Sequence, residues 1–220
     1  MHLNQAIHDI TEKLQDQSQL LCVTKYAPLP CIQSLYDLGI RQFGENKVQD
    51  AEQKINQFSF KDCRWELIGH LQRNKVKKAV SLFDRIQSVD SLKLLEKIND
   101  EAEKIQKKQA ILLQLNFTKD PQKFGFEPEF LTKHLEKIMQ YPHIQVEGIM
   151  TMAPLGLAKD ELYNFFVEAK TFYDILKSRY NSIGTVSMGM SQDYELALEA
   201  GSNLVRLGSI LTTAWEKDQQ

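Results

Sequence analysis

Short apolar runs alternate along this chain with longer stretches in which apolar residues recur every three or four positions. Eight runs have the length and composition of buried strands: residues 20–25, 42–46, 64–69, 83–89, 110–116, 145–150, 185–189 and 204–209. The stretches between them have helical spacing, with one apolar stripe in 92–105 and another in 162–176. Alternating strands and helices predict βαβ units and a parallel sheet, and eight such units are typical of a closed (β/α)8 TIM barrel.

The chain begins with an amphipathic segment. Its apolar positions Leu3, Ala6, Ile7, Ile10 and Leu14 share one helical face. We expect this extra N-terminal helix to cover the outside or the floor of the barrel. Since no composition shift marks a boundary, and since 150–159 has the character of a long loop, we expect residues 1–220 to form a single domain.

Lys25 is the most informative residue, because it closes the first apolar run directly before the proline-containing loop 26–30. A lysine is uncommon where a buried strand ends. Partial desolvation there would lower its pKa and favour the neutral amine, which attacks aldehydes. The alternative is a lysine whose stem packs on the strand while its ammonium reaches solvent.

The turns after the last two predicted strands have the residue types that bind phosphate. Glycine permits close approach of a ligand, while serine hydroxyls and helix N-terminal amides donate to anions. TIM barrels often bind phosphate with the loops after strands seven and eight. Simple capping of the following helix by Ser191 or Asp193 is the alternative. The candidate residues are Ser187, Gly189, Ser191, Gly208 and Ser209.

Two further polar residues lie near strand ends. Arg206 lies within the last apolar run, and alternation places it on the same face as Gly208. A charged residue in a strand needs a partner, so Arg206 either points into the barrel mouth or pairs outside with a helix carboxylate such as Glu199. Asn46 follows the second run and could hydrogen-bond a ligand or cap the next helix.

Composition narrows the function classes. The net charge is −2, from 27 basic and 29 acidic side chains, which argues against binding nucleic acid by charge alone. We read the basic cluster at 73–78 as a solvated helix face. Three cysteines without metal-ligand spacing indicate reduced thiols of a cytoplasmic protein. His70 has no ligand-spaced partner, so no metal site is expected, and no apolar run approaches the ~20 residues of a membrane span.

Seven short motifs resemble the pyridoxal 5′-phosphate homeostasis protein family, the single-barrel relatives of the alanine racemase N-terminal domain. They occur in the family order and run from about Leu21 to Gly208. The motifs are Val-Thr-Lys at 23–25, Phe-Gly-Glu-Asn at 43–46, Ile-Gly-x-Leu-Gln-x-Asn-Lys at 68–75, Lys-x-Gly at 123–125, Gly-Ile-Met-Thr-Met at 148–152, Ser-Met-Gly-Met-Ser-x-Asp at 187–193 and Gly-Ser-x-x-Val-Arg-x-Gly at 201–208.

The resemblance implies that Lys25 holds pyridoxal 5′-phosphate as an internal Schiff base. The 187–191 and 208–209 turns would hold the phosphate, Arg206 would face the pyridine nitrogen and Asn46 would lie near the ring. The chain departs from the family pattern at two places. Residues 210–215 replace the usual Phe-Gly and arginine, and Lys47 replaces the usual tyrosine.

A carrier role in vitamin B6 homeostasis and cofactor delivery follows from the resemblance, with a monomer and apo-forms of cofactor-requiring enzymes as expected partners. A racemase of this type needs two bases and a further β domain, for which this chain has no residues. An arginine at the pyridine nitrogen also disfavours its protonation and weakens the ring as an electron sink. The alternatives are a small racemase using the same lysine, or a barrel aldolase without a cofactor.

Overall fold

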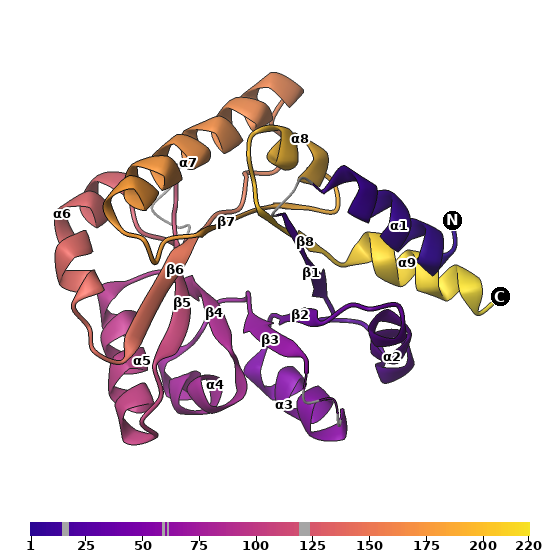
Figure 1. The fold of residues 1–220 in the computed structure, drawn as a ribbon, viewed down its shortest axis with the longest axis horizontal. Helices are drawn as coiled ribbons and strands as arrows, with labels where there is room; N and C mark the ends of the chain where they lie inside the picture. Colours follow the sequence, from indigo (N-terminus) through magenta and orange to yellow (C-terminus); the bar gives the residue numbers. More distant parts are fainter. Residues whose placement is uncertain (15–17, 59, 61, 119–123) are drawn as a thin grey trace.

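The computed structural model describes residues 1–14, 18–58, 60, 62–118 and 124–220. In this part of the chain eight parallel strands close into a barrel in sequence order (Figure 1). All eight predicted strands are present, with ends that differ by no more than two residues from expectation. They are β1 (Gln19–Val23), β2 (Gln42–Glu45), β3 (Arg64–Leu67), β4 (Arg85–Val89), β5 (Gln109–Gln114), β6 (Ile144–Met150), β7 (Thr185–Met190) and β8 (Leu204–Leu207).

Helices surround the strands on the outside of the barrel (Figure 1). The predicted apolar stripes are confirmed in their central positions, where α5 buries Leu95, Ile98 and Ala102 and α7 buries Phe165, Phe166, Ala169 and Leu176. Ile105, at the end of the first stripe, is 52% exposed. The predicted long loop joins β6 to α7. The helices are α1 (Leu3–Lys13), α2 (Leu29–Asp37), α3 (Val48–Gln57), the 3-10 turn η1 (Arg73–Lys75), α4 (Val76–Leu82), α5 (Leu92–Lys104), α6 (Pro128–Met139), α7 (Lys159–Arg179), α8 (Tyr194–Glu199) and α9 (Ser209–Asp218).

The two faces of the barrel wall differ in polarity. Outward-facing strand residues join the helices in one apolar cluster, in which the Phe43 and Trp65 rings lie 5.1 Å apart. Side chains alternate along each strand, so the neighbouring positions point inward. The inner face carries a few buried apolar residues outside that cluster, Leu21 and Leu112 among them, beside buried charged residues such as Glu66 and Arg85. The barrel interior is therefore partly polar.

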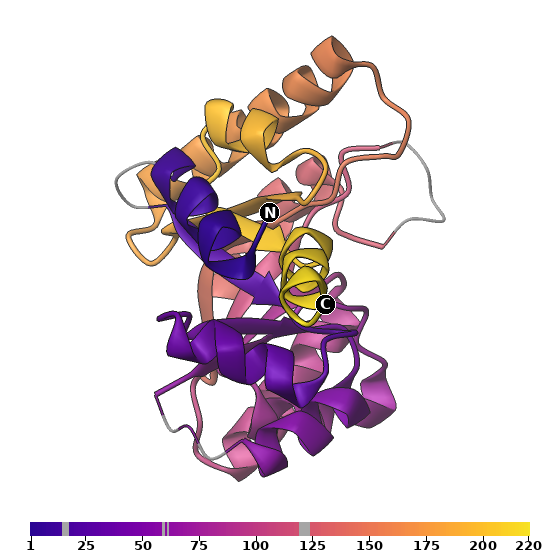
Figure 2. The same cartoon turned by 90° about the vertical axis from the view of Figure 1, so that its right-hand side faces the viewer.

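The N-terminal helix covers the outside of the barrel, as one of the two expectations had it. α1 lies beside α9, and the two chain ends are close in both views (Figures 1 and 2). The Asp218 carboxylate accepts from the Leu3 backbone N–H at 3.0 Å and contacts the His2 ring. The atypical segment 210–215 thus still forms a closing helix.

Arg73, Lys77 and Lys78 of the basic cluster are exposed, as expected of a solvated helix face. Within the residues that the structure describes, no helix combines the length and the apolar composition needed to cross a membrane.

Candidate functional site

The carboxyl ends of β1 and β8 bring Lys25 and Arg206 to the same end of the barrel. The strands are paired in register, with Leu21 opposite Arg206 and Cys22 opposite Leu207. Val23 then lies beside Gly208, and a Cβ placed on Gly208 would be 3.0 Å from the Val23 carbonyl oxygen. Lys25 follows two residues later along the same direction, so the loops after β1 and β8 adjoin.

Lys25 is exposed, which differs from the expected partial burial. β1 ends at Val23, and Thr24 turns its side chain into the protein, so Lys25 is already part of the loop. Its ammonium lies 5.2 Å from the ring centre of Tyr26, which is itself 82% exposed. The lysine is accessible to a ligand in solution.

A buried ionic cluster holds the backbone immediately before Lys25. The Lys54 ammonium, from α3, donates to Glu45 Oε1 at 2.7 Å and to the carbonyl oxygen of Thr24. The Thr24 hydroxyl donates to the same Glu45 oxygen at 2.6 Å. Thr24 and Glu45 are fully buried. This Thr24–Glu45–Lys54 cluster fixes the peptide from which Lys25 emerges.

Asn46 is half-buried at the end of β2, next to the Lys25 loop. The alternative role as a helix cap is not observed, because Lys47 occupies the N-cap position of α3 and makes no side-chain cap bond there. Gly69, after β3, touches this segment so closely that a Cβ would lie 2.1 Å from the Asn46 carbonyl oxygen. The Asn46 backbone is therefore fixed by its neighbour.

Arg206 points into the barrel, and the outward pairing with Glu199 is not formed. Its Nη1 donates to Ser187 Oγ at 2.7 Å and its Nη2 to the Thr151 carbonyl at 2.8 Å. The residue is 3% exposed, and in the described part of the chain no carboxylate forms an ion pair with it. Burial lowers the pKa of the guanidinium to about 10, so it stays charged at neutral pH.

Ser187 belongs to a chain of hydrogen bonds that crosses the barrel interior. Its hydroxyl donates to Gln87 Oε1 at 2.7 Å, and Gln87 Nε2 donates to Glu66 at 2.6 Å. Glu66 accepts two bonds from Arg85, at 2.8 and 2.9 Å. We call Arg85, Glu66, Gln87, Ser187 and Arg206 the interior hydrogen-bond chain. Its members come from β3, β4, β7 and β8.

The two predicted phosphate turns touch each other. The Gly208 N–H donates to Ser191 Oγ at 3.3 Å, and Ser209 is the exposed first residue of α9. Simple capping of α8 does not explain the first turn, since Asp193 makes no cap bond and instead accepts from the Met190 N–H at 2.5 Å. A serine hydroxyl and the free amides at the start of α9 thus lie together.

Gly189 has a structural reason to be glycine. Its φ is +95°, and a Cβ there would lie 2.6 Å from the Ala197 side chain of α8. We expected a glycine here to permit a close approach, and the group that approaches Gly189 closely is helix α8. A role for Gly189 in holding a ligand stays a prediction.

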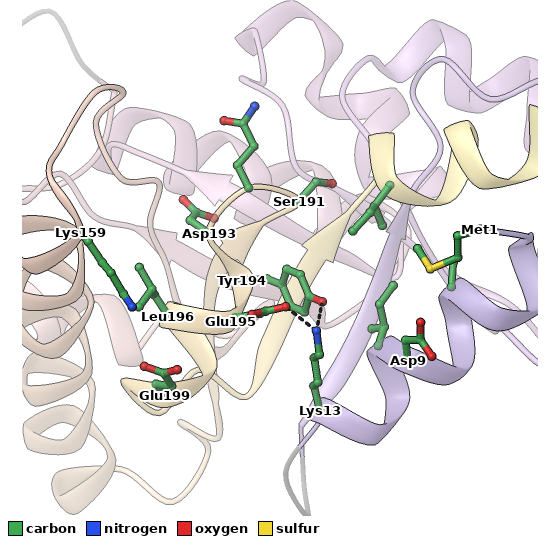
Figure 3. Close-up of a pocket in the computed structure, with 14 residues that line it drawn as sticks. Met1, Asp9, Lys13, Lys159, Ser191, Asp193, Tyr194, Glu195, Leu196 and Glu199 are labelled. Atoms are coloured by element: carbon green, nitrogen blue, oxygen red, sulfur yellow. Dashed lines mark hydrogen bonds and ion pairs between the residues drawn. The ribbon is translucent and has the colours of Figure 1, made fainter.

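A cavity of about 500 Å³ lies outside the barrel between α1 and α8 (Figure 3). Of the predicted site residues, all of which the structure describes, Ser191 alone lines it. The Lys13 ammonium in this cavity is paired with Glu195 (Figure 3). We place the candidate site at the barrel mouth, because the unpaired buried cation Arg206 lies there.

Several site residues were not identified from the sequence. Glu66 and Gln87 lie inside predicted strands, and Lys54 lies on α3, nine residues after its partner Glu45. A polar residue at an inward strand position was the available signal for the first two, as it was for Arg206. The Lys123 position of the Lys-x-Gly motif lies outside the described residues.

Comparison with known proteins shows which family the chain resembles. The family model "Alanine racemase, N-terminal domain" matches residues 2–214. The pyridoxal phosphate homeostasis protein of Synechocystis is 35% identical over 205 residues, covering 92% of this chain and 94% of the relative. The Escherichia coli K12 protein of the same name is 32% identical over 199 residues, covering 89% and 85%.

Solved structures give the same result. PipY of Synechococcus elongatus with PLP bound has a TM-score of 0.90 and 34% identity, covering 96% of this chain and all of that one. An alanine racemase of Clostridium difficile shares the fold, with a TM-score of 0.81 at 16% identity over 56% of its length. The observed barrel and these matches show that the chain belongs to the pyridoxal phosphate homeostasis protein family, whose barrel is that of the alanine racemase N-terminal domain.

Proposed function

We propose that this protein binds pyridoxal 5′-phosphate at the barrel mouth and serves vitamin B6 homeostasis rather than catalysis. Lys25 would hold the aldehyde carbon as a Schiff base, and Ser191, Gly208 and Ser209 would hold the phosphate. Arg206 would donate to the pyridine nitrogen, with Asn46 beside the ring. The bound group supplies a reactive aldehyde, which this site would store and protect.

The donor set fits this ligand. A phosphate accepts hydrogen bonds, and the turn beside α9 offers a hydroxyl, backbone amides and the positive end of a helix. Gly208 packs closely against Val23, since a Cβ there would lie 3.0 Å from the Val23 carbonyl oxygen. The lysine that would form the covalent link is accessible, and the Thr24–Glu45–Lys54 cluster fixes its backbone.

The observation that carries the proposal is the buried guanidinium of Arg206 without a carboxylate partner. Burying a charge is costly unless it is paired, so an unpaired one at the barrel mouth indicates a ligand that needs it. A charged arginine can only donate, which matches an unprotonated pyridine nitrogen. It would keep that nitrogen unprotonated and the ring a weak electron sink.

An unprotonated ring nitrogen suits storage and delivery of the cofactor better than catalytic turnover. We infer that the protein acts as a monomer and passes its cofactor to apo-forms of enzymes that require it. The names of the relatives, which are pyridoxal phosphate homeostasis proteins, support the homeostasis role from which this inference starts.

The test is a titration of the cofactor-free protein with pyridoxal 5′-phosphate, followed by visible absorption. Borohydride reduction and mass spectrometry should then place one covalent adduct on the peptide that contains Lys25. Lys25→Ala should lose the adduct while its thermal unfolding stays close to that of the parent, because an exposed loop residue contributes little stability. Lys47→Ala, in the neighbouring loop and also exposed, is the control and should keep the adduct. An adduct on another lysine, or none, contradicts the proposal.

A further inference from the structure

We propose that Ser187 is a positioning residue for Arg206 and that its hydroxyl does not bind the cofactor phosphate. This inference rests on the proposed function and assigns different tasks to the two serines of one motif. Ser191 donates to the phosphate, whereas Ser187 orients the guanidinium that faces the ring nitrogen. The observation behind it is the direction of each bond in the interior hydrogen-bond chain.

The bond directions are set from the carboxylate end. Glu66 accepts hydrogen bonds from Nε and Nη2 of Arg85, at 2.8 and 2.9 Å. The Gln87 amide must therefore turn its NH2 group to Glu66, which it does at 2.6 Å. That orientation leaves the Gln87 oxygen facing Ser187.

The consequence for Ser187 is that its single hydroxyl proton is already used. It donates to Gln87 Oε1 at 2.7 Å, and its oxygen accepts from Arg206 Nη1 at 2.7 Å. A hydroxyl has one proton to give. A phosphate oxygen accepts and cannot donate when ionised, so Ser187 could bind it only by breaking the bond to Gln87.

The burial of the two serines supports the same division. Ser187 is 0% exposed in the middle of β7, whereas Ser191 is half-buried in the turn beyond it. Ser191 Oγ accepts from the Gly208 N–H at 3.3 Å, which leaves its own proton for a ligand. Burial lowers the pKa of Arg206, whereas the negative charges of Asp193 and of Glu66, which the interior hydrogen-bond chain connects to Arg206, raise it.

The experiment compares Ser187→Ala and Ser191→Ala with two probes, pyridoxal 5′-phosphate and pyridoxal. In Ser191→Ala we expect binding of the phosphorylated probe to weaken by about tenfold or more, with pyridoxal unchanged, because one bond to a charged group is lost. In Ser187→Ala we expect both probes to weaken by a similar factor. The pH dependence of the visible absorption should shift in Ser187→Ala and not in Ser191→Ala, since Arg206 controls protonation of the ring nitrogen.

Further variants protect the test against a folding defect. Gln87→Met removes the acceptor of the Ser187 proton without changing Ser187 itself, and it should weaken both probes and shift the pH dependence as Ser187→Ala does. Ser187→Thr keeps the hydroxyl and should therefore restore part of the binding and of the pH dependence. Loss of the phosphorylated probe alone in Ser187→Ala would make Ser187 a phosphate ligand and overturn the inference, as would unchanged binding and pH dependence in both Ser187→Ala and Gln87→Met. Failure of the unaltered protein to bind either probe would instead refute the proposed function.

Discussion

Arg85 and Arg206 are both buried inside the barrel, yet their partners differ. Arg85 lies between two carboxylates, with a bidentate contact to Glu66 and a bond of 3.1 Å to Glu147. Arg206 has a hydroxyl and a backbone carbonyl as partners. The first arrangement neutralises a buried charge, while the second leaves a cation for a ligand at a cost in stability.

We therefore predict that Arg206→Met raises the free energy of unfolding of the cofactor-free protein by about 1 kcal/mol or more at neutral pH. The folded pKa of about 10 lies below the usual pKa of an arginine, so the unfolded state binds more protons between these two values. The cost of charged Arg206 is thus fully present below pH 10 and declines above it. Urea unfolding at pH 7 measures it, and cofactor affinity should fall in the same variant.

Arg85→Met is the matched control. It should lower the free energy of unfolding by about 3–5 kcal/mol, because the buried Glu66 would lose its bidentate partner and keep, among the described residues, only the Arg64 guanidinium as a cationic partner, at 3.3 Å. A destabilisation of Arg206→Met as large as that of Arg85→Met would show that Arg206 serves the fold rather than a ligand.

At the scale of elements, the Thr24–Glu45–Lys54 cluster ties together β1, β2 and α3. Glu45 is fully buried, and its second oxygen has no partner among the described residues, so its charge depends on Lys54. The Lys54 ammonium is the only group of this cluster that bonds both the carboxylate and the Thr24 carbonyl. The helix after β2 thereby controls the loop after β1.

We predict that Lys54→Met lowers the free energy of unfolding by about 3 kcal/mol, as expected when one partner of a buried pair is removed. The yield of the Lys25 adduct should also fall at limiting cofactor, because the preceding carbonyl loses its bond. Chemical denaturation and borohydride trapping measure the two effects.

Lys78→Met removes a comparable pair with Glu52 on the surface, where the two side chains are 48% and 36% exposed. It should cost less than about 1 kcal/mol and leave the adduct unchanged. Equal losses in Lys54→Met and Lys78→Met would contradict the role of the cluster.

At the scale of the whole molecule, the chain can be compared with an alanine racemase of the same fold. The chain spans 56% of the alanine racemase chain whose fold it shares. Proton exchange at an amino-acid Cα needs a good electron sink and a base on each face. Under the proposed function, Arg206 would weaken the electron sink, and Lys25 would supply one base of the two.

We predict that the cofactor-loaded protein does not exchange the Cα proton of amino acids at a useful rate. A positioned general base is worth about 10²–10⁴-fold in rate, so the lack of one leaves little activity. The measurement is deuterium incorporation into several L-amino acids in deuterated water, followed by mass spectrometry. Rapid incorporation that disappears in Lys25→Ala would establish the racemase alternative, whereas transfer of the cofactor to an apo-enzyme would support delivery.

The order of elements could be predicted from the sequence alone. Each apolar run and each helical stripe carries its own periodicity, so eight strands, the N-terminal helix and the loop after β6 were all recognisable locally. Lys25 and the turns after β7 and β8 could be named for the same reason, because the carboxyl ends of barrel strands meet at one end. The family motifs then indicated that the cofactor is pyridoxal 5′-phosphate.

Pairing between distant residues was decided only by the tertiary structure. Ser187 and Ser191 belong to one motif, but barrel closure brings Gln87 and Arg206 to the first and Gly208 to the second. The direction of Arg206 depended on which face of β8 points inward, and the exposure of Lys25 on where β1 ends. Periodicity describes one element at a time, whereas hydrogen-bond partners, burial and charge pairing arise between elements whose residues lie as far as 215 positions apart.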